Sequence, residues 1–252
     1  MILGVIQARL SSKRLPGKVL LPILGKPVLW HIYQRLKFST KLDEICISTS
    51  KNSSDDLIEH FAKENNIKIF RGSEENLILR HLGAAELFNA DVIVRITADD
   101  PLVDPKIIDD IISLYQQNPE VDFVCNNKEH TFPIGLDIEL IPVKTLKKFE
   151  SISNDPIFYE FFIGNYIFEH PSTFKSIGLR LDEPILERWT LDFSEDYEFI
   201  KQIYLHLYEK NRNFSMNDIL KLLNKKPELR SINSMHYSEF SHLKYKKFRK
   251  QN

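Results

Sequence analysis

Short runs of β-branched and other apolar residues alternate, in the first half of the chain, with longer segments in which apolar positions recur every three or four residues. The short runs are typical of buried strands, and the spaced pattern is typical of amphipathic helices. The predicted strands are residues 2–8, 44–49, 67–70, 91–97 and 121–125, and the predicted helices between them are residues 27–38, 54–65, 75–88 and 105–117. This α/β alternation predicts a mainly parallel sheet with helices on both faces.

The second half of the chain follows a less regular pattern. It predicts strands at residues 135–141, 176–181 and 187–192, and helices at residues 157–168, 194–210 and 215–224. Residues 230–252 form a basic tail, and we interpret its last part, KYKKFRKQN at residues 244–252, as a solvated chain end. Because no repeat, low-complexity tract or glycine-rich linker interrupts the sequence, we predict a single domain over residues 1–252, with halves of about residues 1–126 and 127–225.

Composition narrows the class of protein. The 252 residues are 42% apolar and 27% charged, with a formal net charge of −1, which is ordinary for a globular protein and unlike a general nucleic-acid binder. Since no apolar run has membrane-spanning length and the N-terminus lacks the layout of a signal peptide, we expect a cytoplasmic protein without membrane or nucleic-acid partners. Cys46 and Cys125 lie in apolar runs and are expected in the core.

Positive charge gathers in the loop that follows the first predicted strand. The loop, QARLSSKRLPGK at residues 7–18, precedes the first acidic residue of the chain, Asp43. It combines cations with small residues that allow close backbone approach: Arg9, Ser11, Ser12, Lys13, Arg14, Gly17 and Lys18. The loop matches neither GxxxxGK[ST] nor GxGxxG, but it lies at the sheet edge where α/β proteins bind phosphates. It predicts a polyphosphate clamp, and the alternative is a solvent-facing loop that only adds solubility.

Carboxylates follow other predicted strands and suit a magnesium ion, which prefers hard oxygen ligands. Asp99 and Asp100 come directly after the fourth strand, and Asp192 ends a later one. Helix capping explains Glu195 and Asp196, which open the next helix, but it explains neither Asp99 nor Asp192. We therefore predict Asp99 and Asp192 as the metal-binding pair, with Asp100 either an outer-shell contact or a solvated side chain.

Five motifs occur in order along the chain: IQARLSSKRLPGKVLLPILGKPVL, FRGSEENLILR, VRITADDPLVDP, FPIGLDIEL and RWTLDFSEDYEFI. Together they resemble the cytidylyltransferase superfamily over about residues 2–225, and most of all its spore coat polysaccharide biosynthesis protein F branch. That branch is similar to CMP-sialic acid synthetases and to 3-deoxy-manno-octulosonate cytidylyltransferases. The resemblance implies a magnesium-dependent enzyme that transfers CMP from CTP to an acceptor and releases pyrophosphate, for cell-surface polysaccharide or glycoconjugate synthesis.

The same resemblance implies a fold and a set of site residues. The fold would be the Rossmann-like, nucleotide-diphospho-sugar transferase-like form of the α/β sandwich. It would form a homodimer, in which the second half supplies the dimerisation extension and the acceptor site. The motif match places CTP near Ala8, Arg9, Ser11, Lys13, Arg14, Lys18, Arg71 and Thr97, the acceptor near Asp137, Glu139 and Glu160, and the metal on Asp99 and Asp192. Arg9, Lys18 and Asp99 would be catalytic, with Lys18 stabilising the transition state.

The chain departs from the family pattern in its second half. Where family members carry Arg-Glu-His, this sequence has Tyr159, Glu160 and Phe161. We interpret the aromatic residues as core or interface packing, but a sugar-acid carboxylate then loses an expected cationic partner. The acceptor is therefore either an acidic sugar or a small phosphate or phosphonate. Two hypotheses compete with this enzyme class: a nucleotide-sugar-dependent glycosyltransferase, which the adjacent aspartates of TADDP disfavour, and a non-catalytic nucleotide-binding protein.

Overall fold

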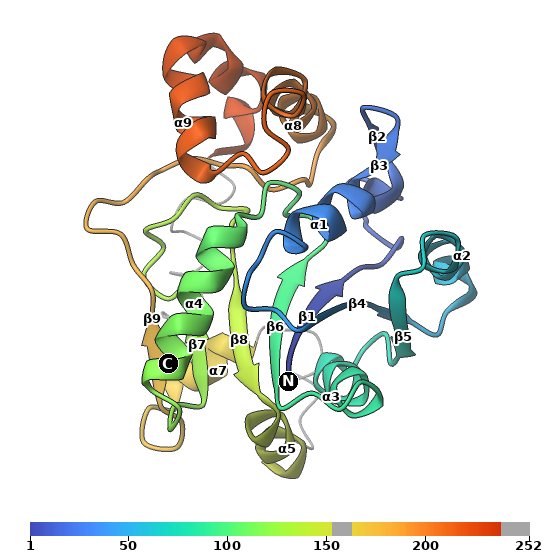
Figure 1. Cartoon of the computed structure of the whole chain (residues 1–252), viewed down its shortest axis with the longest axis vertical. Coiled ribbons are helices and arrows are strands. Elements are labelled where there is room, and N and C mark those ends of the chain that lie inside the picture. Colours follow the sequence, from blue (N-terminus) through green and yellow to red (C-terminus); the bar gives the residue numbers. More distant parts are fainter. Residues whose placement is uncertain (153–162, 238–252) are drawn as a thin grey trace.

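A central seven-stranded sheet organises the computed structural model of the chain, which describes residues 1–152 and 163–237 (Figure 1). The strands are β1 (Ile2–Gln7), β4 (Glu44–Ser50), β5 (Lys68–Gly72), β6 (Val92–Thr97), β7 (Phe123–Cys125), β8 (Glu139–Pro142) and β9 (Ser176–Gly178). Their order across the sheet is β5-β4-β1-β6-β8-β7-β9. Strand β8 is antiparallel to β6 and β7, and the other neighbouring pairs are parallel, so the predicted mainly parallel sheet is confirmed.

Helices cover both faces of this sheet, as the alternating pattern predicts. They are α1 (Val28–Leu36), α2 (Asp56–Glu64), α3 (Leu77–Leu87), α4 (Pro105–Gln117), α5 (Val143–Ile152), α7 (Ile163–Glu169), α8 (Ser194–Leu207) and α9 (Met216–Lys225). Helices α1, α2 and α4 pack on one face, and α3, α5 and α7 pack on the other. In Figure 1, α8 and α9 lie at the end of the molecule to which the arrows of β1 and β6 point. A short hairpin of β2 (Pro22–Ile23) and β3 (Lys26–Pro27) precedes α1.

The side-chain alternation of β1 shows how the sequence builds these two layers. Leu3 and Val5 point into the apolar cluster around α3, α5 and α7, whereas Ile6 belongs to the cluster around α1, α2 and α4. Successive side chains of a strand point to opposite faces, so a strand covered on both faces must be apolar throughout. Cys46 and Cys125 are buried free thiols, and their predicted core placement is confirmed.

Several predictions for the second half need correction. The strand predicted at 135–141 begins only at Glu139, and the one predicted at 176–181 ends at Gly178. The strand predicted at 187–192 is wrong. Its N–H groups donate to two loops instead of a neighbouring strand, at Ile134 O (2.7 Å from Trp189 N) and Asp99 O (2.7 Å from Leu191 N). The first part of the helix predicted at 157–168 lies outside the described residues, and α7 is its remainder.

Gly135 is required where the loop before β8 passes the segment at 188–190. Its φ angle is +101°, which L side chains rarely adopt. A Cβ atom there would lie 2.5 Å from Thr190 N and 2.6 Å from the Trp189 carbonyl carbon, and both of these are backbone atoms with little freedom to move. The glycine therefore brings together the two segments that exchange backbone hydrogen bonds beneath Asp99.

Assembly and location are properties that a single chain does not show. The homodimer, the dimerisation role of the second half and the division near residue 126 stay predictions. Among the helices that the structure describes, none combines the length and the apolar character that crossing a membrane requires. The cytoplasmic location also stays a prediction.

We predict that Gly135→Ala lowers the free energy of unfolding by about 2–4 kcal/mol, because backbone strain adds to a clash with fixed backbone atoms. Gly25→Ala is the matched control: Gly25 has a φ of +75°, but a Cβ atom there would meet nothing within 4 Å, so only about 1 kcal/mol of strain is expected. Urea unfolding followed by circular dichroism measures both. Equal losses in the two variants would contradict the close approach at Gly135.

Candidate active site

The Lys18 ammonium joins three segments that are distant in the sequence. Its Nζ atom donates to Asp99 Oδ2 (2.8 Å), to Asp192 Oδ1 (2.9 Å) and to the backbone oxygen of Leu191 (2.7 Å). Lys18 is only 8% exposed. Burial alone would lower the pKa of this lysine, but the Asp99 and Asp192 charges outweigh burial and raise its pKa above the usual value. The ammonium therefore stays charged and fixed at neutral pH.

Local structure around β1 and β6 places this group. Lys18 opens a 3-10 turn (Lys18–Leu20) directly after Gly17, whose φ of +70° turns the loop back over the sheet. Asp99 follows β6, the strand paired with β1, so both residues lie beyond the carboxyl ends of neighbouring parallel strands. This is the edge at which open α/β sheets bind ligands. The Asp99 side chain is 31% exposed and the Asp192 side chain only 4%, so Asp99 forms the accessible side of the site.

A buried ion pair beneath Asp192 holds that carboxylate in place. Asp196 Oδ2 accepts hydrogen bonds from the backbone N–H groups of Asp192 and Phe193, both at 3.0 Å. The Arg188 guanidinium donates to both Asp196 oxygens, at 2.7 and 3.2 Å, and Asn233 Nδ2 donates to one of them at 2.9 Å. The predicted capping role of Asp196 is confirmed, but its second role, as the partner of Arg188, could not be foreseen from spacing.

The basic loop is anchored at its start by Asp55, which sequence reasoning missed. Asp55 Oδ1 accepts from Leu10 N (2.8 Å), and its Oδ2 accepts from Ser50 Oγ (2.5 Å). Asp55 is almost fully buried. In the sequence it stands in a serine- and aspartate-rich stretch that looks like a helix cap, so nothing there signals a contact with residue 10. This bond fixes the first turn of the loop against the end of β4.

The loop cations differ in their contacts. Arg14 Nη2 lies 2.6 Å from Asp192 Oδ1, so Arg14 belongs to the site. Arg9 and Lys13 are exposed and form no ion pair with the residues that the structure describes. Ser11 Oγ donates to Glu74 Oε1 at 3.1 Å, and Ala8 is buried at the end of β1. The predicted contacts of Ala8, Arg9, Ser11 and Lys13 with CTP stay predictions.

Arg71 lies apart from this centre, on β5. Its Nη1 is 2.7 Å from Asp56 Oδ1 and 2.5 Å from Glu59 Oε2, and its Nε donates to the Ser50 carbonyl oxygen. The guanidinium is therefore engaged by two carboxylates of the neighbouring helix. The structure does not bring Arg71 together with Lys18, and its role near the cytidine stays a prediction.

A second acidic group lies next to Asp99. Asp100 is buried, and its Oδ2 accepts from Thr97 Oγ1 at 2.6 Å, so of the two alternatives for this residue the solvated side chain is wrong. Burial raises the pKa of Asp100 well above its usual value, and the charges of Asp99 and Asp137 add to this effect. Burial alone would also raise the pKa of Asp99, but Lys18 reverses that and the pKa of Asp99 is lowered. Asp99 therefore stays ionised while Asp100 takes up a proton more readily.

The residues predicted to face the acceptor lie on and before β8. Arg95 Nη1 donates to Glu139 Oε2 at 2.7 Å, and Arg95 Nε donates to Gln7 Oε1 at 2.8 Å. Burial raises the pKa of Asp137 to about 6 and that of Glu139 to about 7, against the lowering effect of Arg95. Glu160 lies outside the described residues. The acceptor roles of Asp137, Glu139 and Glu160 stay predictions.

The two carboxylates fit a divalent cation whose remaining ligands come from elsewhere. Asp99 and Asp192 each direct one oxygen at the same ammonium, so their oxygens converge on one positive charge. No group of three or more acidic, histidine or cysteine side chains capable of holding a metal occurs within residues 1–152 and 163–237. Magnesium is usually held by one or two carboxylates, with water and substrate phosphates completing its shell. The donor set therefore suits magnesium better than a metal that needs a cage of protein ligands.

The basic loop after β1 thus meets one carboxylate that follows the neighbouring strand β6 and a second that precedes α8. The family model described as cytidylyltransferase matches residues 3–245, and the chain belongs to that family. It is 31% identical over 235 residues to the spore coat polysaccharide biosynthesis protein SpsF of Bacillus subtilis (strain 168), a match that covers 90% of this chain and 95% of that protein. A cytidylyltransferase structure from Leptospira borgpetersenii serovar Hardjo-bovis (strain JB197) superposes with a TM-score of 0.85 at 35% identity, over 91% of this chain and 96% of that one.

A third similarity covers about half of the chain. The 8-amino-3,8-dideoxy-manno-octulosonate cytidylyltransferase of Shewanella frigidimarina (strain NCIMB 400) is 34% identical over 116 residues, 46% of this chain and 47% of that protein. The resemblance drawn from the motifs is confirmed, and so is the nucleotide-diphospho-sugar transferase-like fold. The chain is a cytidylyltransferase. This sets aside both the glycosyltransferase and the non-catalytic hypotheses.

We predict that Asp196→Asn destabilises the fold by about 3 kcal/mol, because Arg188 loses its charged partner inside the protein. Glu195→Gln, on the same turn of α8 but 37% exposed, is the matched control and should change the free energy of unfolding by less than about 0.5 kcal/mol. Thermal and urea unfolding of both variants measures the difference. A stability of Asp196→Asn equal to that of the control would contradict the supporting role assigned to this pair.

Proposed function

We propose that this cytidylyltransferase transfers CMP from CTP to a hydroxyl of an acidic sugar, with magnesium held by Asp99 and Asp192 and with release of pyrophosphate. The observation that carries the proposal is the convergence of both carboxylates on the ammonium of Lys18, the last residue of the basic loop. The names of two relatives support the acceptor class. One acts on an amino-dideoxy-octulosonate, a sugar acid, and the other belongs to polysaccharide biosynthesis.

Fixed cations are what the transfer step requires. The acceptor hydroxyl oxygen bonds to the α-phosphorus and gives up its proton to water, the bond from that phosphorus to the bridging oxygen breaks, and pyrophosphate leaves with the electron pair. Negative charge then grows on the non-bridging oxygens and on the leaving group. Lys18 and Arg14 both form ion pairs with Asp192 and supply preorganised positive charge. Arg9 and Lys13 lie on the same loop and form no ion pair with the described residues, so both are available to the phosphates.

The ion pairs of Lys18 also prepare the site for a metal. Its ammonium keeps the pKa of Asp99 low, so this carboxylate is ionised and ready to bind a cation. When bound, magnesium supplies further positive charge to the triphosphate and orients it for attack. Asp99 and Asp192 would hold the ion, and Lys18 would remain beside them as a fixed positive charge for the phosphate oxygens. Loss of such a preorganised group slows transfer by about 10²–10³-fold.

We predict that Asp99→Asn and Asp192→Asn each reduce magnesium-dependent pyrophosphate release by about 10²–10³-fold or more, because the metal loses a charged ligand. Asp110→Asn is the matched control. Asp110 is 44% exposed on α4 and pairs with Lys106 on the surface. The rate of pyrophosphate release by Asp110→Asn should therefore stay within about twofold of that of the wild type. Thermal melting establishes that each variant is folded. Full turnover in both site variants would contradict the assignment of the metal ligands.

We predict that pyrophosphate is released from CTP, and not from ATP, GTP or UTP, when magnesium and one member of a panel of sugar acids are present. Added EDTA should stop the release. The same panel should include small phosphates and phosphonates, since release with one of these in place of every sugar acid would replace the proposed acceptor class. Continuous coupled detection of pyrophosphate provides the measurement.

A further inference from the structure

Arg80 presents two donor groups that nothing in the described structure accepts. It is the fourth residue of α3 and is 1% exposed. Its Nη1 donates to the backbone oxygen of Ser73 at 3.0 Å, while Nε and Nη2 are buried and have no hydrogen-bond partner among the residues described. In a planar guanidinium, the Nε–H bond and one Nη2–H bond point the same way and form a two-pronged fork. Arg80 is therefore anchored through one nitrogen, and its fork is left open.

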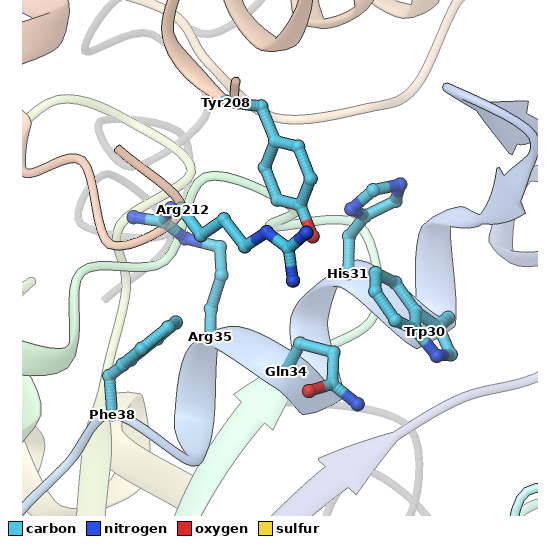
Figure 2. Close-up of a pocket in the computed structure, with 7 residues that line it drawn as sticks. All are labelled: Trp30, His31, Gln34, Arg35, Phe38, Tyr208 and Arg212. Atoms are coloured by element: carbon cyan, nitrogen blue, oxygen red, sulfur yellow. The ribbon is translucent and has the colours of Figure 1, made fainter. Parts of the chain in front are cut away.

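Arg35 shows how the fold uses the same fork when the role is structural. Arg35 is also 1% exposed, but its Nε donates to the Val103 backbone oxygen (2.6 Å) and its Nη2 to that of Phe214 (2.7 Å). Its guanidinium carbon lies 4.1 Å from the centre of the Phe214 ring. Figure 2 shows this arginine in the wall of a cavity of about 110 Å³, with α1 residues and Tyr208 around it. Both prongs are satisfied there, whereas both are unsatisfied in Arg80.

An open, buried fork is costly unless a ligand fills it, because an unpaired buried donor forfeits its hydrogen bond to water. Burial, together with the charges of Arg95 and Arg9, lowers the pKa of Arg80 to about 10, so the side chain is still charged at neutral pH. The negative charges of Asp55 and Glu74 act in the opposite direction and raise the pKa of Arg80. Both of them accept hydrogen bonds from the basic loop and from residues at the end of β4, while the Arg80 fork stays unpaired.

The position of Arg80 in the sheet indicates which part of a nucleotide it meets. Gly72 ends β5, and a Cβ atom there would lie 2.8 Å from Arg80 Cγ, so the glycine makes room for the arginine beside the ends of β4 and β5. The cations proposed for the triphosphate belong to the loop after β1, and the acceptor residues belong to β8, on the opposite side of β6. With the predicted acceptor residues beyond β6, the side of the β1 loop that remains for the base is that of β4 and β5, where Arg80 lies.

We propose that the open fork of Arg80 binds the O2 and N3 atoms of the cytosine base and makes the enzyme select CTP over UTP. This inference rests on the proposed function. Cytosine offers two adjacent acceptors at O2 and N3, which match two parallel donors. Uracil carries a hydrogen on N3, so one prong of the fork would face another donor. Solvent does not reach the two nitrogens, so the inference requires the side chains that cover them to move when the base binds.

The test compares nucleotide affinities of the full-length wild type and of Arg80→Lys, which keeps the charge and removes the fork. Calorimetry with magnesium, CTP or UTP should show CTP binding weakened by about 10- to 100-fold in Arg80→Lys, the usual range for loss of a bidentate base contact. UTP binding should change less than about threefold, because uracil does not use the full fork. Arg35→Lys is the matched control: it should lower the melting temperature and leave the CTP-to-UTP affinity ratio unchanged.

A modified nucleotide tests the same contact without changing the protein. In 3-deaza-CTP a C–H group replaces N3, so the wild type should bind it about 10- to 100-fold more weakly than CTP, while Arg80→Lys should hardly distinguish the two. Equal weakening of CTP and UTP by Arg80→Lys would assign the fork to a phosphate and overturn the inference. Unchanged nucleotide affinity, with or without a raised KM for the acceptor, would also overturn it. A wild type that binds no CTP would instead refute the proposed function.

Discussion

The placement of one positive charge constrains most of this structure. The Lys18 ammonium is buried and must be paired, because an isolated buried charge is too costly to retain. Its partners come from the turn after β6 and from the segment before α8, so loops from both halves of the chain have to meet at one point. The left-handed turn at Gly17, the glycine at 135 and the Arg188–Asp196 pair each serve this meeting. Each of them lies beside or beneath the segments that hold Lys18 and its partners.

The first half of the fold could be predicted well from the sequence, because its information is local. Apolar runs and spaced apolar positions mark buried strands and amphipathic helices directly, and α4 begins and ends where the pattern places it. The meeting of Lys18, Asp99 and Asp192 could also be anticipated, since Lys18 belongs to the loop after the first strand and helix capping explains neither aspartate. The proximity of Asp99 to Lys18 follows from the parallel pairing of β1 with β6, whereas the segment before α8 brings in Asp192.

What could not be predicted depends on partners distant in the sequence. The segment at 187–192 has the composition of a strand, but its donors are taken by Ile134 and Asp99. The sequence around Asp55 suggests a helix cap, but its carboxylate accepts a hydrogen bond from the backbone N–H of Leu10. Asp100 looks solvated, yet the fold buries it against Thr97. Arg71 and Arg80 lie in one motif, and only the structure separates an arginine held by two carboxylates from one whose fork is open. Residue propensity and spacing carry no information about hydrogen-bond and ion-pair partners that are distant in the sequence.

The separation in sequence between Lys18 and its partners bears on how the protein is made. The ammonium bonds to Leu191 and Asp192 across 173 and 174 residues, and Asp196 in turn bonds to Asn233. During synthesis on a ribosome, the parallel strands at the N-terminal end can pair long before these residues have left the exit tunnel. The cluster around Lys18 is therefore completed among the last events of folding. A nascent chain that lacks these residues carries the basic loop without the acids that balance it, and it can form the proposed site only after Asp192 and Asn233 have been made.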